Sequence, residues 1–362
     1  MSVDAFQGTH PLPATGPYMI ASYHPNRELR FVRNPYFREW SKAAQPDGYP
    51  DTIVLEIGGS IDEAIDDVIQ GRADMLSTLW SAVLPADRLA ALKTRHARQV
   101  KINPSQLVAS LFLNTRVAPF DHLDVRRALS YAIDRAAAVE TQGGPDQAVP
   151  TCQILPPDYP GYRAYCPYTA GSTTAGKWTS PDLAKARRLV ARSGTRGMKV
   201  TVWDYNGYPG FGRVAAQALR SLGYRASFKI VDHDLPLPFW DSRAKAQIGW
   251  WGWGTDYPAA SAWFSPTLTC GSFQPNSYSN YNAAQFCNPR IDREIRLAVS
   301  QQAKDPEAAR KLWSRIDRDV VDLAPIAPLI VWNLVDLLSE RVGNYQYSGR
   351  GQGLLINQLW VR

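Results

Sequence analysis

The stretch 198-MKVTVWDYNGYPGFGRVAAQALRSLGYRASFKIV-231 changes its hydrophobic period twice and decides the fold class. Apolar and polar side chains alternate in 198–203 and 224–231, as in strands, whereas apolar residues in 213–222 recur at the helical period. Gly223 follows the helical segment and is a typical stop. A strand, a crossover helix and a second strand in this order favour parallel pairing. We therefore expect an α/β fold.

Strands and helices also alternate through the rest of the chain. Ser60 and Glu63 predict a capping box at the start of one helix. Ser180 and Pro181 predict the cap and the first residue of another helix, which ends at Gly194. Further strands are predicted over 18–33, 51–57, 107–115, 246–253 and 353–362, and further helices over 124–139, 289–302 and 305–322.

Size and composition exclude several classes of protein. With 362 residues, 45% of them hydrophobic, the chain is long enough for two or three domains. The net charge is +7, but the cations are dispersed, which favours a solvated basic surface over a nucleic-acid partner. No segment reaches the ~18 uninterrupted apolar residues of a membrane span. Residues 1–16 lack the basic start and apolar core of a signal peptide, so we expect none in this sequence.

The stretch 249-GWWGWGTDYP-258 places bulky aromatic side chains beside one carboxylate, and two interpretations fit it. In one, the tryptophans belong to a core strand and Asp256 begins a turn. In the other, they line a pocket, because a carboxylate in a water-poor aromatic wall needs a cation in place of its hydration. A ligand ammonium supplies one through a charge-assisted hydrogen bond. The candidate ligand-binding residues are Trp250, Trp251, Trp253, Gly254, Thr255, Asp256 and Tyr257.

The sequence shows no familiar catalytic or metal-binding pattern. It contains no G-x-S-x-G, H-E-x-x-H or G-x-x-x-x-G-K-[ST] motif, and no two of its five histidines lie within four residues of each other. Asp232, His233 and Asp234 follow a strand, a pattern compatible with an acid–base site but more typical of a turn. The run 349-GRGQG-353 follows no strand and opens no helix, so we expect no phosphate site. We expect no enzyme activity, no cofactor and no metal.

The four cysteines fall into two close pairs, Cys152 with Cys166 and Cys270 with Cys287. None lies in a C-x-x-C motif, which argues against zinc and thioredoxin-type sites. Of the three possible connectivities we favour the two local bridges, with four buried free thiols as the alternative. Disulfides imply an oxidising compartment. That compartment conflicts with the missing signal peptide unless the true N-terminus has been removed.

Four segments in order carry a resemblance to a known family. They are 15-TGPYMIASYHPNRELRFVRNPYF-37, 60-SIDEAIDDVIQGRADM-75, 112-FLNTRVAPFDHLDVRRALSYAIDR-135 and 182-DLAKARRLVARSG-194. Together they resemble the family 5 extracellular solute-binding proteins, the peptide-, dipeptide- and nickel-type receptors of ABC importers. The resemblance covers almost the whole chain.

The resemblance gives a role to 252-GWGTD-256. In peptide-binding members, a strand of the second lobe ends in a motif like G-W-x-x-D, whose Asp holds the ligand's α-ammonium. The preceding strand pairs with the peptide main chain. The resemblance therefore implies that Asp256 is the amine anchor and that Trp253, Gly254 and Thr255 line the site. It also implies that a Cys270–Cys287 bridge staples a loop over the pocket rim.

The implied fold is periplasmic-binding-protein-like, of type II and close to cluster C, with two lobes that close at a hinge. Lobe I is expected over 1–116 and 337–362, and lobe II over 117–336. The implied function is the capture of a di- or oligopeptide outside the cytoplasm and its delivery to an ABC permease in the membrane. We expect a monomer that breaks no bond and binds no nucleic acid.

Two departures from the family leave alternatives open. Family members are normally longer and carry a signal peptide and a further domain upstream, so the chain resembles a truncated, processed or fused portion. Its Trp- and Tyr-rich composition also exceeds what the motif requires. The alternatives are a binding protein for another solute, such as an oligosaccharide stacked on Trp250, Trp251 and Trp253; a ligand-sensing domain of a regulator; and a hydrolase around Asp232 and His233.

Overall fold

The computed structural model describes residues 13–43, 45–78, 83–171, 176–206, 210–232, 238–349 and 353–362. These residues form two compact units. Unit 1 comprises the described residues up to Asn103 together with Val335–Arg362, and unit 2 comprises those within Pro104–Leu334. The predicted lobes end instead at residues 116 and 336. Whether the lobes close on a ligand stays a prediction.

Unit 2 contains the strand–helix–strand segment that indicates the fold class. Strands β7 (Lys199–Tyr205) and β8 (Arg225–Val231) pair in parallel, and α6 (Phe211–Ser221) lies between them in the sequence. On its other side, β7 pairs in parallel with β9 (Ile248–Trp253). Strand β9 pairs antiparallel with β5 (Val100–Leu113). The predicted α/β class and its parallel pairing are therefore confirmed.

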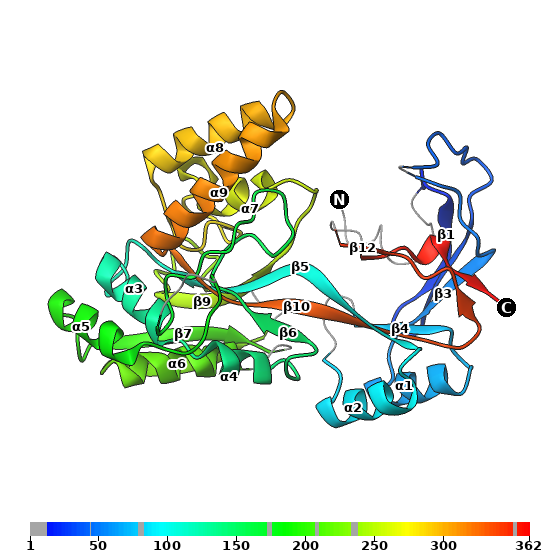
Figure 1. Ribbon diagram of the computed structural model, residues 1–362, viewed down its shortest axis with the longest axis horizontal. Coiled ribbons are helices and arrows are strands. Elements are labelled where there is room, and N and C mark those ends of the chain that lie inside the picture. Colours follow the sequence, from blue (N-terminus) through cyan, green and yellow to red (C-terminus); the bar gives the residue numbers. More distant parts are fainter. Residues whose placement is uncertain are drawn as a thin grey trace. The chain divides into compact units, whose positions relative to one another are not determined.

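Helices lie on both sides of the unit 2 sheet (Figure 1). On one side α6 packs against β7, β8 and β9, and α4 and α5 lie on that side as well. The other side carries α7, α8 and α9. None of the helices in the described ranges combines the length and apolarity needed to cross a membrane. The bounds are α3 (Leu123–Ala132), α4 (Arg135–Glu140), α5 (Leu183–Ser193), α7 (Ser261–Leu268), α8 (Pro289–Gln302) and α9 (Pro306–Leu323).

Strand β10 (Ile326–Leu338) runs beside β5 in the sheet. It also pairs antiparallel with β4 (Met75–Ser77) and β6 (Ala148–Pro150). Its residues contribute to the apolar cores of both units, as Leu329 does in unit 2 and Leu337 in unit 1.

The described part of unit 1 holds an antiparallel sheet, two helices and two short ribbons. Helix α1 begins at the predicted capping box: the Ser60 hydroxyl accepts from the Glu63 N–H at 3.2 Å, and the Glu63 carboxylate accepts from the Ser60 N–H at 2.8 Å. The bounds are β1 (Tyr18–His24), β2 (Glu28–Arg33), β3 (Thr52–Glu56), α1 (Ile61–Ile69), α2 (Ala86–Arg95), and the ribbons β11 (Val342–Gly343) with β14 (Trp360–Val361) and β12 (Tyr347–Ser348) with β13 (Gly353–Leu354).

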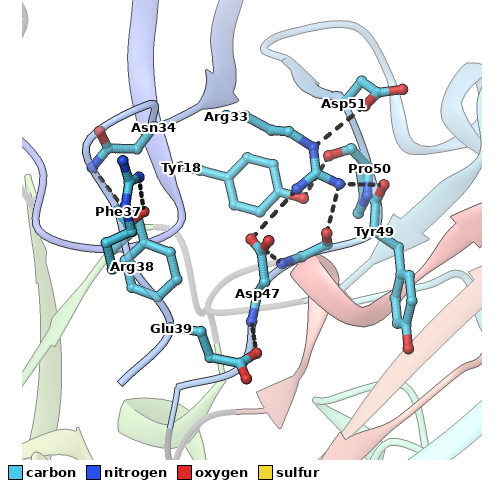
Figure 2. Close-up of polar contacts among 12 residues, drawn as sticks. Tyr18, Arg33, Asn34, Phe37, Arg38, Glu39, Asp47, Tyr49, Pro50 and Asp51 are labelled. Carbon is cyan, nitrogen blue, oxygen red and sulfur yellow. Dashed lines mark hydrogen bonds and ion pairs between the residues drawn. The ribbon is translucent and has the colours of Figure 1, made fainter. Parts of the chain in front are cut away.

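The T-G-P-Y and R-N-P-Y-F segments meet in unit 1, where they have a structural role (Figure 2). The Arg33 guanidinium donates from Nη2 to the carbonyl oxygens of Gly48 at 2.6 Å and Tyr49 at 2.9 Å. The Tyr18 hydroxyl donates to the Pro50 carbonyl at 2.6 Å. These side chains therefore fix the loop that leads into β3.

The predicted start of α5 is two residues early. Its N-cap is Asp182, whose carboxylate accepts from the Lys185 N–H at 2.9 Å, and the helix begins at Leu183. The Ser180 carbonyl instead accepts from the Ala170 N–H at 2.9 Å. Ser180 therefore belongs to the preceding loop, and Asp182 caps the helix in its place.

The predicted C-terminal strand over 353–362 is also wrong. The short strands β13 and β14 are separated there by a 3₁₀ turn, Ile356–Gln358. The turn is fixed from the loop before β3, because the Tyr49 N–H donates to the Asn357 carbonyl at 2.9 Å and the Gln358 side chain donates to the Asp47 carbonyl at 2.9 Å. Contacts between residues so far apart in the sequence leave no trace in the local pattern of apolar and polar residues.

Candidate functional site

Strand β9 divides its three tryptophans between two faces of the sheet. Trp250 faces α6, where its ring stacks on Tyr205 at 4.5 Å and meets the edge of Phe211 at 4.6 Å, both between centroids. It is 0% exposed, and its Nε1 donates to the Asp204 carboxylate. Burial raises the pKa of Asp204, which also accepts from the Gly212 N–H at 2.9 Å. Trp250 is thus a core residue of unit 2, and we leave it out of the proposed binding surface.

Trp251 and Trp253 face the other way and join Trp240 and Tyr281 in an aromatic cluster. Ring centroids are 3.8 Å apart for Trp240 and Trp251, and 5.5 Å apart for Trp251 and Trp253. The Tyr281 ring lies 5.7 Å from Trp251 and 5.6 Å from Trp253 and is 44% exposed. Such a surface can contact an apolar group or a cation. Sequence reasoning missed Trp240 and Tyr281, which lie outside the 249–258 stretch.

A small cavity lies beneath the aromatic cluster inside unit 2. Trp251 and Trp253 line it together with Ser110, Phe112 and Trp263, among others. It has room for about one water molecule. A ligand side chain would enter it only if these side chains moved.

The turn after β9 is held by a residue that the sequence analysis did not single out. The Tyr159 hydroxyl lies 2.7 Å from the Thr255 hydroxyl and donates to the Tyr257 carbonyl at 3.0 Å. The Thr255 hydroxyl also contacts the Tyr257 carbonyl. A Cβ at Gly254 would lie 2.7 Å from Cδ2 of Leu107, so a larger residue there would displace that side chain.

Asp256 lies between the two residues that Tyr159 contacts. Its side chain is exposed, and no hydrogen bond or ion pair to its carboxylate occurs within the described ranges. The sequence predicts this carboxylate in a water-poor wall, whereas in the structure of unit 2 its side chain is exposed. Its charge is therefore available to a ligand cation.

Both predicted disulfides are present, which rules out four free thiols. Cys152 is bonded to Cys166, and Cys270 to Cys287. The first bridge closes the loop that contains Tyr159. The second follows α7, where the Cys270 N–H donates to the Asp292 carboxylate at 3.1 Å. That the second bridge staples a pocket rim stays a prediction.

A buried carboxylate on α9 anchors the first disulfide loop. Asp317 is 0% exposed and accepts from the Gln153 side chain at 2.8 Å and the Ile154 N–H at 3.1 Å. Burial raises the pKa of Asp317 to about 7, and the hydrogen bonds from Gln153 and Ile154 oppose that rise. No cation pairs with this carboxylate in the part of the chain that the structure describes.

The contribution of Asp317 to the free energy of unfolding should therefore fall as the pH rises from about 4 to about 7. The folded state keeps the Asp317 proton to a higher pH than the unfolded state, so this contribution is complete below the unfolded pKa and is lost through the folded pKa. Urea unfolding across this range measures the slope. Asp317→Asn should flatten it, and Asp158→Asn, in the same loop but exposed, should not. Equal slopes in Asp317→Asn and the unsubstituted protein would contradict the assignment.

The structure adds no support for a catalytic site at residues 232–234 or a phosphate site at 349–353. Asp232 is exposed and accepts from the Asn206 side chain at 3.2 Å, whereas His233 and Asp234 lie outside the described residues, as do residues 350–352 of the glycine-rich run. Within the described ranges, no three His, Cys, Asp or Glu side chains gather as metal ligands.

Comparisons with known sequences identify one family. The profile described as bacterial extracellular solute-binding proteins, family 5 Middle, matches residues 4–275. The glutathione-binding protein GsiB of Salmonella paratyphi A is 24% identical over 349 residues, which are 93% of this chain and 62% of the relative. GsiB of Escherichia coli O157:H7 is 24% identical over 285 residues, 76% of this chain and 52% of the relative. The chain thus spans about three fifths or less of these relatives' length.

Solved structures share the fold. The clavulanic acid biosynthesis oligopeptide binding protein 2 superposes with a TM-score of 0.81 at 22% identity, covering 96% of this chain and 63% of that one. The oligopeptide-binding protein OppA of Haemophilus influenzae, in complex with RPPGFSPFR, gives 0.69 at 18% identity, with 96% and 64% covered. A dipeptide-binding protein of Pseudoalteromonas sp. SM9913, in complex with Met-Leu, gives 0.71 at 18% identity, with 96% and 64% covered. The predicted periplasmic-binding-protein-like fold is confirmed.

Proposed function

The chain belongs to the bacterial extracellular solute-binding proteins of family 5, and from this premise we propose that it binds a peptide at the end of β9 and delivers it to an ABC permease. Solved proteins of the same fold hold the peptides RPPGFSPFR and Met-Leu, and the curated relatives are named for glutathione, itself a peptide. A main chain with a free α-amine is common to these ligands. That chemistry suits a site with one carboxylate.

One observation carries the proposal: an exposed carboxylate, without a partner among the described residues, lies after an aromatic strand in a turn that is held on both sides. Asp256 accepts hydrogen bonds from the ligand's α-ammonium and supplies the opposite charge. Trp253, Gly254 and Thr255 border the bound amine, and Tyr257 lies next to it. Main-chain pairing leaves ligand side chains free, so affinity does not require one peptide sequence.

The aromatic cluster supports an oligosaccharide as a second candidate ligand, because sugar rings stack on indole faces. In that surface Trp240, Trp251 and Trp253 are half-buried, and Tyr281 is exposed. The carboxylate favours the peptide, since a neutral sugar gives Asp256 no cation. The two candidates therefore differ in their dependence on a ligand amine.

The remaining parts of the proposed function follow from family membership. Lobes over 1–116 with 337–362 and over 117–336 close on the peptide, and the monomeric protein releases it intact to the permease. The two disulfides support a location outside the cytoplasm, in the periplasm or anchored at the cell surface after export by a signal peptide. Neither a cofactor nor a metal takes part.

Titration calorimetry with three ligands tests the proposal: a free-amine tripeptide, its N-acetylated form and a neutral trisaccharide. We expect the free-amine peptide to bind at least about tenfold more tightly than the acetylated one, since a charge-assisted hydrogen bond contributes about 1.5–3 kcal/mol. The trisaccharide should release no heat. Tight trisaccharide binding without peptide binding would establish the sugar alternative. Peptide cleaved during a long incubation would establish the hydrolase.

A further inference from the structure

We propose that Tyr159 is a positioning residue for Asp256, and that its hydroxyl, held by the Cys152–Cys166 loop, sets how strongly the protein prefers ligands with a free amine. The inference rests on the proposed function, because it concerns the same amine-binding carboxylate. It assigns a role to a residue far from the β9 motif in the sequence.

The Tyr159 hydroxyl bridges the two residues that flank Asp256. It lies 2.7 Å from Oγ1 of Thr255 and 3.0 Å from the carbonyl oxygen of Tyr257. Three contacts join these groups: Tyr159 to Thr255, Tyr159 to the Tyr257 carbonyl, and Thr255 to the same carbonyl. The two hydroxyls have one proton each, so two of the three contacts can be hydrogen bonds at the same time. One phenol thus closes the turn on both sides of the carboxylate.

The Asp256 carboxylate depends on this turn for its position. Within the described ranges it has no hydrogen bond or ion pair of its own, so its place is set by its backbone. Beyond the Tyr159 contacts, the turn is held by the Thr255 hydroxyl, which contacts the Tyr257 carbonyl, and by the Ala259 N–H, which donates to the same carbonyl at 2.7 Å. Before the turn, the Trp253 Nε1 donates to the Ala262 carbonyl at 2.9 Å, and after it the Tyr257 hydroxyl donates to the Ser261 hydroxyl at 3.2 Å. The Thr255 hydroxyl that spans Asp256 is itself 2.7 Å from the Tyr159 hydroxyl, so Tyr159 supports that contact.

Tyr159 is itself held rigidly. Its side chain is 3% exposed, and its ring meets the edge of the Trp263 ring at 6.3 Å between centroids. Gly161, at φ +97°, brings the backbone against α9, where a Cβ would lie 2.7 Å from the Trp313 Cβ. Because packing holds the ring in place, the Tyr159 hydroxyl also fixes the Thr255 and Tyr257 groups that it contacts.

The loop around Tyr159 is closed at its base. The Cys152–Cys166 bridge joins its ends, and Gln153 crosses it, donating to the Arg163 carbonyl at 3.0 Å and accepting from the Tyr165 N–H at 2.5 Å. Burial raises the pKa of Tyr159, so the phenol keeps its proton at neutral pH and remains a donor.

Tyr159→Phe tests the proposal with a ratio of affinities. The readout is the Kd of an N-acetylated peptide divided by that of the same peptide with a free amine, measured by calorimetry. Tyr159→Phe should lower this ratio by about tenfold, because a small displacement of a charged anchor weakens only the contact that needs the charge. A role in packing alone would weaken both ligands equally and leave the ratio unchanged. An unchanged ratio therefore overturns the proposal.

Tyr162→Phe is the matched control in the same loop, since no hydrogen bond from its hydroxyl occurs within the described ranges. It should leave the ratio at the unsubstituted value. Asp256→Asn distinguishes a failure of the amine anchor from a failure of the positioning role of Tyr159. A ratio that collapses in Asp256→Asn but not in Tyr159→Phe refutes the positioning role alone. A ratio that survives Asp256→Asn refutes the amine anchor, and the role of Tyr159 with it.

Discussion

Replacing Asp256 with asparagine should lower the affinity for a free-amine peptide by about 10- to 100-fold, since a charge-assisted hydrogen bond contributes about 1.5–3 kcal/mol. Asparagine keeps the shape and one acceptor oxygen but not the charge. Because the carboxylate has no partner in the described part of the chain, the substitution should leave the fold and its stability unchanged. Calorimetry and thermal unfolding of the same samples measure the two effects.

Asp232→Asn is the control for this prediction. Asp232 is also exposed and lies after a strand of unit 2, but it is not on the β9 turn. Its substitution should leave peptide affinity unchanged. Equal losses in Asp232→Asn and Asp256→Asn would point to the general charge of the protein, and no loss in Asp256→Asn would contradict the amine anchor.

Replacing Trp250 with alanine should lower the free energy of unfolding by about 3–5 kcal/mol, the range for a large aromatic side chain lost from a packed core. The Tyr205 and Phe211 rings lose their partner, and the buried Asp204 carboxylate loses an N–H donor. Trp250→Phe keeps one aromatic ring but removes the donor and part of the buried volume, and it should cost about 1–3 kcal/mol. Urea unfolding measures both.

Trp251→Ala is the matched control on the other face of β9. Its ring is partly exposed and belongs to the aromatic cluster, so its removal should cost less stability than that of Trp250. Trp250→Phe should bind peptide as the unsubstituted protein does at temperatures where it is folded. A loss of affinity in Trp250→Phe without a loss of stability would contradict the core placement.

The sequence by itself determined the elements that depend on local chemistry. The periods of 198–231 predicted β7, α6 and β8, and the Ser60–Glu63 capping box is formed as predicted. The spacing of the cysteines favoured the two local bridges that the structure contains. In each case the interacting residues are near each other in the chain, or the pattern of burial repeats at a known period.

The tertiary structure decided what depends on distant partners. Alternation along β9 placed Trp250 opposite Trp251 and Trp253, but only the position of α6 shows which face is buried. The predicted strand over 353–362 is interrupted by the turn Ile356–Gln358, which the loop before β3 contacts through the Tyr49 N–H. Tyr159 precedes Thr255 by 96 residues, so no local pattern connects its hydroxyl to the Asp256 turn. Periodicity reports only that a side chain is buried or exposed, whereas its partner is set by how the whole chain packs.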